Sequence, residues 1–231
     1  MSRLSIIIPT LNEETGIADA LEALAPLHRR GTEVIVVDGG SHDGTIERAR
    51  RFATRVLSAP RGRAAQMNVG AAAAVGDVLL FLHADTTLPE GADDIVLYGL
   101  TGSIRNWGRF DVVIEGRHPL LPVVAGLMNL RSQFTGIATG DHAIFVTKAA
   151  FDNVGGFPDI PLMEDIALSK RLKRLGRPLC LVERVTTSGR RWERHGVLAT
   201  IMLMWRLRLA YAFGAEPAAL AQRYGYVQRD R

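Results

Sequence analysis

Two adjacent acids, Glu164 and Asp165, lie at the predicted start of a helix in the second half of the chain. A carboxylate held there could accept the proton of a reacting hydroxyl group as a general base. It could also serve the helix alone, because acidic side chains interact favourably with the dipole at a helix N-terminus. The residues by themselves leave both roles open.

Four polar clusters follow the short apolar runs of the first hundred residues. They span residues 9–13, 38–45, 62–63 and 83–85. Ligands of open α/β sheets collect at the carboxyl ends of the strands, so these clusters are expected to meet at one edge. Ser41, Asp43 and Thr45 fit turns and helix caps. Asp38 directly follows a buried run, where an acid could hydrogen-bond a ribose or a base, and no G-x-G-x-x-G motif points to a dinucleotide.

The elements that must position these clusters alternate along the first hundred residues. β-Branched runs predict strands at 4–9, 33–37, 55–58 and 77–82, and helical spacing predicts helices at 15–25, 45–52 and 64–74. This order favours βαβ units with a parallel sheet. The unbroken apolar run at 77–82 predicts a strand buried on both faces. The first hundred residues are therefore expected to form a nucleotide-binding half.

The pattern changes beyond residue 100. Residues 109–114 alternate like an antiparallel strand, 120–130 form an apolar helix or loop, and 142–146 form another strand. A helix at 163–175 stopped by Gly176 and Pro178, a strand at 179–185 and a long helix at 197–213 follow. A mixed, Rossmann-like α/β sheet flanked by helices fits this order. The length of 231 residues favours one domain spanning the chain.

The bulk composition limits the class of protein. Hydrophobic residues make up 47% and charged residues 23%, which favours a globular enzyme over a disordered chain. The net charge of +4 suits an anionic partner such as a nucleotide, a nucleic acid or a membrane surface. The basic residues at 170–174 are interleaved with apolar ones on an ordinary amphipathic helix. No nucleic-acid partner is therefore expected.

Several features favour a cytoplasmic location. The single Cys180 lies in an apolar run and is expected to be a buried thiol in a reducing compartment. The first apolar run is too short for a signal peptide, and no stretch is long enough to span a membrane. The helix at 197–213 carries an apolar stripe flanked by Arg206 and Arg208. The stripe is expected either to dock on the protein's own core, which is the default, or to associate peripherally with anionic lipid. Its members are Leu198, Ile201, Met202, Trp205, Leu209 and Phe213.

The polar clusters together resemble the family 2 glycosyltransferases of the GT-A fold. The opening match is carried by SIIIPTLNEE at 5–14 and VVDGGSHDGT at 36–45. It continues through FLHAD at 81–85, GDHAIFV at 140–146, GGF at 155–157 and MEDIAL at 163–168, and so covers nearly the whole chain. The motifs GRAAQMN at 62–68, MED at 163–165 and SGRRW at 188–192 are similar to the branch called radical-SAM/selenodomain-associated transferases, which is linked with arsenosugar biosynthesis.

The resemblance implies a sugar donor and assigns it a pocket. It implies that a nucleoside-diphosphate sugar is bound, with Asp38 on the base or ribose and Pro9, Thr10 and Glu13 in the same pocket. Arg63 is either a base or phosphate contact or a solvated surface arginine. Residues beyond about 100 become the half that binds the acceptor, a molecule with a free hydroxyl group, and carries out catalysis.

The resemblance also implies a divalent metal, Mn²⁺ or Mg²⁺, on the donor diphosphate. The family usually has Asp-x-Asp where this chain has His83-Ala84-Asp85, so Asp85 matches and His83 departs. One acid can suffice, because phosphates and waters complete the coordination of Mg²⁺. An imidazole in the first shell would favour Mn²⁺, and a structural His83 is the alternative.

The catalytic roles follow from the same resemblance. Asp165 matches the general base of inverting members, with Glu164 as a supporting neighbour or acceptor contact. Asp141 is either an acceptor contact or a turn residue. The segment Arg190, Arg191 and Trp192 is expected near the diphosphate and acceptor, with a solvated basic loop as the alternative. The sequence thus predicts an inverting, hexosyltransferase-like enzyme.

Two other functions compete with sugar transfer. A sugar nucleotidyltransferase would carry a glycine-rich, arginine-containing phosphate loop after the first strand, and Pro9-Thr10-Leu11-Asn12 is not such a loop. A noncatalytic nucleotide-sugar-binding or scaffold protein is favoured by the missing acid at His83. Asp165 argues against it.

Overall fold

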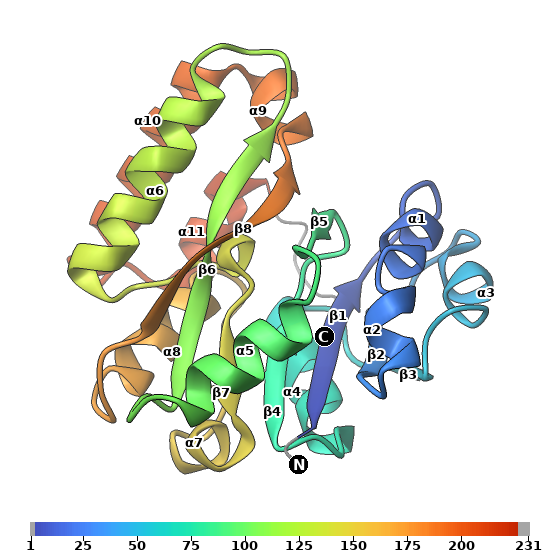
Figure 1. Ribbon diagram of the computed structural model, residues 1–231. Coiled ribbons are helices and arrows are strands. Elements are labelled where there is room, and N and C mark those ends of the chain that lie inside the picture. Colours follow the sequence, from blue (N-terminus) through green and yellow to red (C-terminus); the bar gives the residue numbers. More distant parts are fainter. Residues whose placement is uncertain (1–2, 226–231) are drawn as a thin grey trace.

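A single mixed sheet organises the computed structural model, which describes residues 3–225. Its strands lie in the order β3-β2-β1-β4-β7-β6-β8-β5, and helices cover both faces (Figure 1). The predicted mixed α/β sheet flanked by helices is confirmed.

The first four strands run parallel, as the sequence predicts. They are β1 (Leu4–Thr10), β2 (Glu33–Asp38), β3 (Arg55–Ser58) and β4 (Val78–Phe81). The connecting helices are α1 (Ile17–Glu22), α2 (Ala25–Arg29), α3 (Thr45–Ala49) and α4 (Arg63–Ala73). The expected helix at 15–25 is therefore shorter and is followed by a second one. Pro26 lies in the first turn of that second helix, where a proline costs no hydrogen bond.

Both faces of this half are covered because consecutive strand residues point to opposite sides. Ile6 and Ile8 of β1 join one apolar cluster with α1, whereas Ile7 joins a second cluster with α4. Every residue of β4 is buried, which confirms the two-sided burial expected there. All four strands end at the same edge, where their polar residues follow.

The second half adds strands that run in both directions. β7 (Phe145–Thr147) pairs antiparallel with β4 and with β6 (Trp107–Glu115), while β8 (Leu179–Ser188) runs parallel to β6 and pairs antiparallel with the short β5 (Thr86–Thr87). The strand expected at 109–114 is therefore antiparallel to only one of its neighbours. The strand expected at 142–146 begins only at Phe145, because residues 140–142 form a 3₁₀ turn that includes His142.

Helices of the second half include two long ones at the same end of the molecule (Figure 1). α6 (Leu121–Thr135) resolves the open choice between helix and loop, and α10 (Val197–Ala212) matches the expected long helix. The helix α8 (Glu164–Leu172) begins at the paired acids. The remaining helices are α5 (Ala92–Thr101), α7 (Lys148–Asn153), α9 (Arg190–His195) and α11 (Pro217–Tyr224).

Two burial predictions are wrong. Of the stripe on α10, only Ile201 packs against the core, because Val197, Thr200 and Leu207 occupy the inward face. The other five members are exposed: Leu198, Met202, Trp205, Leu209 and Phe213. Cys180 is half-buried, not buried. It lies on the first part of β8, whose outer edge is open because β5 pairs only with Thr186 and Thr187.

Candidate functional site

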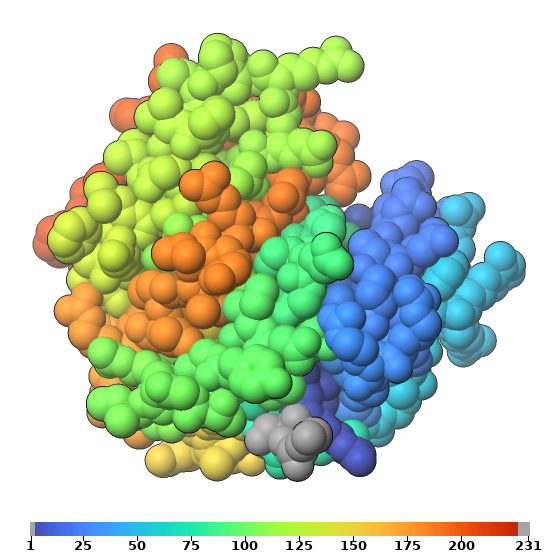
Figure 2. All heavy atoms as spheres, viewed as in Figure 1, coloured from blue at the N-terminus to red at the C-terminus, as the bar shows by residue number. Residues whose placement is uncertain are grey.

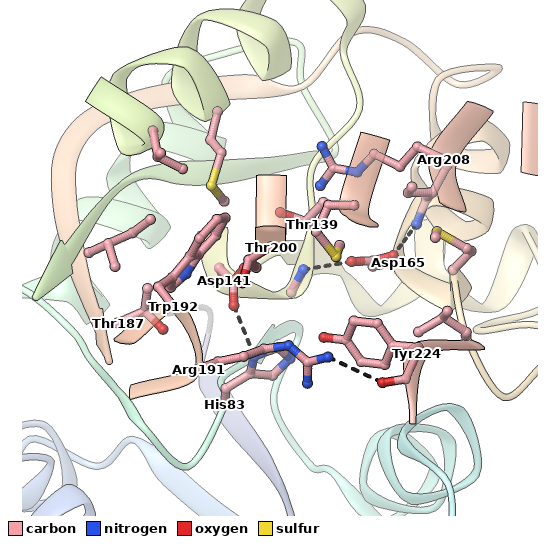
Figure 3. Close-up of a pocket in the computed structure, with 18 of the residues that line it drawn as sticks. His83, Thr139, Asp141, Asp165, Thr187, Arg191, Trp192, Thr200, Arg208 and Tyr224 are labelled. Carbon is pink, nitrogen blue, oxygen red and sulfur yellow. Dashed lines mark hydrogen bonds and ion pairs between the residues drawn. The ribbon is translucent and has the colours of Figure 1, made fainter. Parts of the chain in front are cut away.

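A cavity of about 610 Å³ lies where the ends of the strands meet the start of α8 (Figure 3). Its polar wall contains Pro9, Glu13, Arg63, His83 and Asp85 from the strand ends, and Asp141, Glu164 and Asp165 from the second half. Its apolar wall comes from α6 and α10. The fold therefore brings most of the predicted site residues around one space.

Asp38 and Thr10 do not line this cavity. Asp38 is 2% exposed, and its carboxylate accepts hydrogen bonds from the backbone N–H groups of Gly40 and Ser41 at 2.8 and 2.9 Å. The hydroxyl of Ser41 also donates to it. Thr10 is buried, and its hydroxyl donates to the carbonyl of Val37. In this structure, then, the carboxylate of Asp38 supports its own loop.

Gln66 explains part of the GRAAQMN motif in structural terms. Its Nε2 donates to the carbonyl oxygens of Thr10 and Val37, each at 2.8 Å, and so joins the ends of β1 and β2. Asn68 exchanges hydrogen bonds with the backbone of Phe157 in the GGF segment. Both amides thus tie α4 to backbone that is distant in the sequence.

The acids of α8 are held tightly. Oδ2 of Asp165 accepts the backbone N–H of Gly140 at 2.9 Å, and Oδ1 accepts the N–H of Ile166 at 2.7 Å. Glu164 is 4% exposed, and its Oε1 lies 3.9 Å from Nη1 of Arg63. Met163, immediately before them, adopts the left-handed conformation (φ 69°), which is costly for a residue other than glycine. Such backbone strain concentrates at functional sites.

Burial shifts the acidity of both groups. Desolvation, with the charge of Asp165 added, raises the pKa of Glu164 to about 7, against the opposing charge of Arg63. Desolvation also raises the pKa of Asp165, although the hydrogen bonds from Gly140 and Ile166 act in the other direction. A carboxylate with a raised pKa is a stronger proton acceptor, as a general base requires. Glu13 also has a raised pKa, through burial and the neighbouring charge of Asp85.

His83 faces Asp141 (Figure 3). Nδ1 of His83 lies 3.5 Å from Oδ1 of Asp141, and the other side of the ring packs so closely on Gly140 that a Cβ there would overlap it. Burial disfavours the ionised form of Asp141, but the hydrogen bond and charge of His83 hold its pKa below the ordinary value. Both sides of the imidazole are thus engaged by protein atoms.

The protein side chains at the cavity suit a divalent cation that takes most of its ligands from substrate phosphates and waters. Asp85 is exposed and lines the cavity, and the described residues contain no cluster of three or more acids, histidines and cysteines for a metal. Mg²⁺ is commonly held by one or two carboxylates together with substrate phosphates and waters. Asp85 alone can play that part, and the placement of His83 favours its structural role.

The segment at 190–192 contributes only its last two residues to the cavity. Arg191 and Trp192 on α9 line the cavity, whereas Arg190 is 63% exposed and has its Nη2 4.0 Å from Oε2 of Glu13. The guanidinium of Arg191 stacks over the ring of Tyr224, 3.7 Å from its centroid, and donates to the carbonyl of that residue. Helix α11 therefore positions Arg191.

The structure adds two arginines that motif analysis missed. Arg131 of α6 and Arg208 of α10 line the cavity, and Figure 3 shows the Arg208 side chain extended into it on the side of Thr139 and Asp165. Burial lowers the pKa of Arg131, and the charges of Asp165 and Asp141 oppose that shift. The sequence contains only a weak signal for a role in the site: each arginine interrupts a mostly apolar helix.

The first part of the chain is similar to a known enzyme family. Residues 5–97 match the family model described as glycosyl transferase family 2. The matched segment contains β1 to β4 and the polar clusters that follow them, so it supplies the strand-end wall of the cavity.

Two curated relatives match most of the chain. It is 26% identical to the probable glycosyltransferase YdaM of Bacillus subtilis, over 95% of this chain and 57% of that protein. It is 29% identical to the succinoglycan biosynthesis protein ExoA of Rhizobium meliloti, over 78% of this chain and 61% of that protein. The chain thus spans about three fifths of the length of these curated relatives.

Solved structures show the fold. TarS of S. aureus, in complex with UDP-GlcNAc, superposes with a TM-score of 0.65 at 20% identity, over 80% of this chain and 58% of that one. The mannosyltransferase PcManGT of Pyrobaculum calidifontis, in complex with GDP-Man and Mn²⁺, gives a TM-score of 0.64 at 21% identity, over 97% and 69%. The fold is that of GT-A glycosyltransferases.

Proposed function

We propose that the protein transfers a sugar from a nucleoside-diphosphate donor to an acceptor hydroxyl group, with inversion at the anomeric carbon. One observation carries the proposal: Glu164 and Asp165 line the same cavity as Glu13, Arg63 and Asp85 from the segment that matches the family model. A donor held at the strand ends would present its sugar to the carboxylate of Asp165.

In the proposed step, Asp165 accepts the proton of the acceptor hydroxyl group. The acceptor oxygen forms a bond to the anomeric carbon as the bond from that carbon to the diphosphate oxygen breaks, and the nucleoside diphosphate leaves. Displacement from the opposite face inverts the centre. The backbone N–H of Gly140 orients the base through Oδ2. Arg63 and Arg191, which line the cavity, are proposed to neutralise the leaving diphosphate.

The donor pocket is proposed to consist of Pro9, Glu13 and Arg63, which line the cavity, together with Thr10 and Asp38, which are buried beside it and would have to become accessible to the nucleotide. UDP-sugars and GDP-sugars are the first donors to test, since solved neighbours contain UDP-GlcNAc and GDP-Man. A Mn²⁺ or Mg²⁺ ion held by Asp85 would supply charge neutralisation on the diphosphate. We further propose that the transferred sugar is a hexose, that residues 1–231 act as one domain, and that the enzyme is cytoplasmic. Membership of the radical-SAM/selenodomain-associated branch stays a prediction from the motifs.

The test is a donor screen with UDP-, GDP- and dTDP-sugars, with and without Mn²⁺ or Mg²⁺. We expect one donor to raise the melting temperature and to be hydrolysed slowly without acceptor. Thermal stabilisation without any hydrolysis or transfer would support a noncatalytic nucleotide-sugar-binding protein instead. The configuration of the product glycoside, read by NMR, tests inversion.

A further inference from the structure

Helices α6 and α10 expose large apolar side chains to solvent. On α6, Val123, Leu127, Leu130 and Phe134 are between 49% and 72% exposed, and on α10, Leu198, Met202, Trp205 and Leu209 are between 59% and 71% exposed. These eight residues are called the α6–α10 face. In Figure 2 the atoms of α6 form the upper left of the surface, and those of α10 emerge along the same edge. Contiguous apolar surface of this kind marks an interaction site.

The α6–α10 face is continuous with the cavity. Leu127, Leu130, Phe134 and Trp205 are exposed and at the same time line the cavity that contains Asp165. Behind them, Val124, Met128, Ile201 and Met204 extend the apolar lining inward. An apolar part of the cavity therefore leads from the surface of α6 and α10 to the proposed general base.

Two arginines at the inner end of this apolar lining have guanidinium N–H groups without hydrogen-bond partners in the part of the chain that the structure describes. Nε and Nη2 of Arg131 and Nε of Arg208 are buried and have no hydrogen-bond partner within residues 3–225. Buried donors without partners are costly, and cationic ones more so. Both side chains line the cavity, where an anionic group would balance their charge.

The charge of the two helices selects the partner. Neither α6 nor α10 contains an aspartate or glutamate, and together they carry Arg131, Arg206 and Arg208. Apolar surface next to cationic charge suits a membrane with anionic headgroups. A second copy of the chain would bring the same cationic face against it. No helix within residues 3–225 is long and apolar enough to cross a bilayer.

We propose that the acceptor is an anionic amphiphile presented by a lipid surface, with its apolar chain between α6 and α10 and its anionic group at Arg131 and Arg208. This rests on the proposed sugar transfer. The acceptor hydroxyl group then lies at Asp165, which takes its proton, while the nucleoside diphosphate departs on the side of the strand ends.

The first experiment measures cosedimentation with vesicles of phosphatidylcholine alone and of phosphatidylcholine with 30% phosphatidylglycerol. We expect the wild type to bind the anionic vesicles at least tenfold more tightly. The triple variant Leu198→Gln, Met202→Gln, Leu209→Gln should lose that binding, because its sites are exposed on the α6–α10 face outside the cavity lining. Its control is Tyr98→Gln, Ile104→Gln, Val182→Gln, which removes three large apolar side chains that are at least as exposed but lie elsewhere.

Each result has a defined meaning. Equal loss in both triple variants, or no binding to either vesicle, would overturn the membrane assignment. Sedimentation velocity provides a further check. A wild-type dimer that dissociates only in the Leu198, Met202 and Leu209 triple variant would also overturn the membrane assignment, since a second copy of the chain would then cover the α6–α10 face. Donor-induced thermal stabilisation is measured in parallel. If the donor stabilises the protein but vesicles do not bind, the inference fails alone; if the donor has no effect, the proposed function fails.

The second experiment tests the arginines with decyl phosphate and inorganic phosphate as calorimetric probes. Decyl phosphate should bind at least tenfold more tightly, and Arg208→Gln should lose most of that affinity. Arg206→Gln is the control, because Arg206 lies two residues away on α10, exposed and outside the cavity lining. Arg131→Gln provides the same readout if Arg208→Gln does not fold. Equal affinity for the two probes, or equal loss in the control, would overturn the anion site.

Discussion

The backbone N–H of Gly140 donates a hydrogen bond of 2.9 Å to Oδ2 of Asp165, across 25 residues of sequence. The Gly-Asp-His turn is thereby tied to the start of α8. A carboxylate held in this way keeps one orientation toward the cavity, so its reactivity does not depend on a flexible side chain.

Asp165→Asn should remove the proposed general base while keeping the shape of the side chain. We expect kcat to fall about 10²–10⁴-fold, because loss of a general base typically has that effect. Donor affinity should change little. Steady-state kinetics at saturating donor and acceptor measure this. If Glu164→Gln gives the large loss and Asp165→Asn does not, the two acids exchange roles; if neither matters, the inverting mechanism is wrong for this chain.

Asp85→Ala should abolish stimulation of turnover by Mn²⁺ or Mg²⁺. Asp85 is the acid that matches the family metal motif and lies exposed in the cavity. His83→Asn is the control and should keep the stimulation, since the His83 ring faces Asp141 and Gly140. Turnover is measured across a metal titration. Full wild-type activity in excess chelator, after verified metal removal, would contradict a metal role.

Gly140→Ala should reduce activity through the geometry of the site. A Cβ at Gly140 would overlap the ring of His83, and relief of that overlap must move the ring or the N–H that holds Asp165. We expect a loss of at least tenfold in kcat, because small misplacements at a reacting centre are costly. Gly126→Ala, in α6 where a Cβ meets nothing within 4 Å, should leave kcat unchanged. Wild-type kinetics for Gly140→Ala would show that the contact is dispensable.

The pH dependence of stability should carry the signature of Glu164. Its pKa is raised from 4.5 to about 7 in the folded state, so the folded protein binds more protons than the unfolded chain between these values. Stability therefore falls as pH rises from about 4.5 to about 7 and levels off above, by up to about 3 kcal/mol.

Urea unfolding at pH 5, 6, 7 and 8 measures this fall. Glu164→Gln should flatten the curve, whereas Glu90→Gln, at an exposed position, should keep the wild-type slope. Parallel curves for the wild type and Glu164→Gln would show that Glu164 ionises normally.

Asp38→Ala should weaken nucleotide binding about 10- to 100-fold, as expected for loss of a charge-assisted hydrogen bond of about 1.5–3 kcal/mol. Ser41→Ala removes the hydroxyl that donates to Asp38 and accepts the N–H of Asn12, but it keeps the carboxylate, so its affinity should stay near that of the wild type. Calorimetry with the nucleoside diphosphate measures both. Equal affinities in the two variants would assign Asp38 to loop support alone.

The local pattern determined the nucleotide half of the fold. β-Branched and unbroken apolar runs placed β1 to β4 within a residue or two of their observed bounds, and polar residues after each run located the site edge. Pro9, Glu13, Arg63 and Asp85 could be predicted to converge because parallel strands end at the same edge.

Side-chain contacts, strand direction and the buried face of a helix depend on residues distant in sequence, so only the tertiary structure decided them. The side-chain oxygens of Asp38 accept hydrogen bonds from the Gly40–Ser41 loop, and no spacing rule separates such a contact from one to a ligand. The pairing of β6 with β7 and β8 set its mixed direction. On α10, apolar residues occur all round the helix, so periodicity could not tell which face would be buried. The contacts of Leu207 with the start of α8 and with α11 decided it, and they left Trp205 and Leu209 exposed.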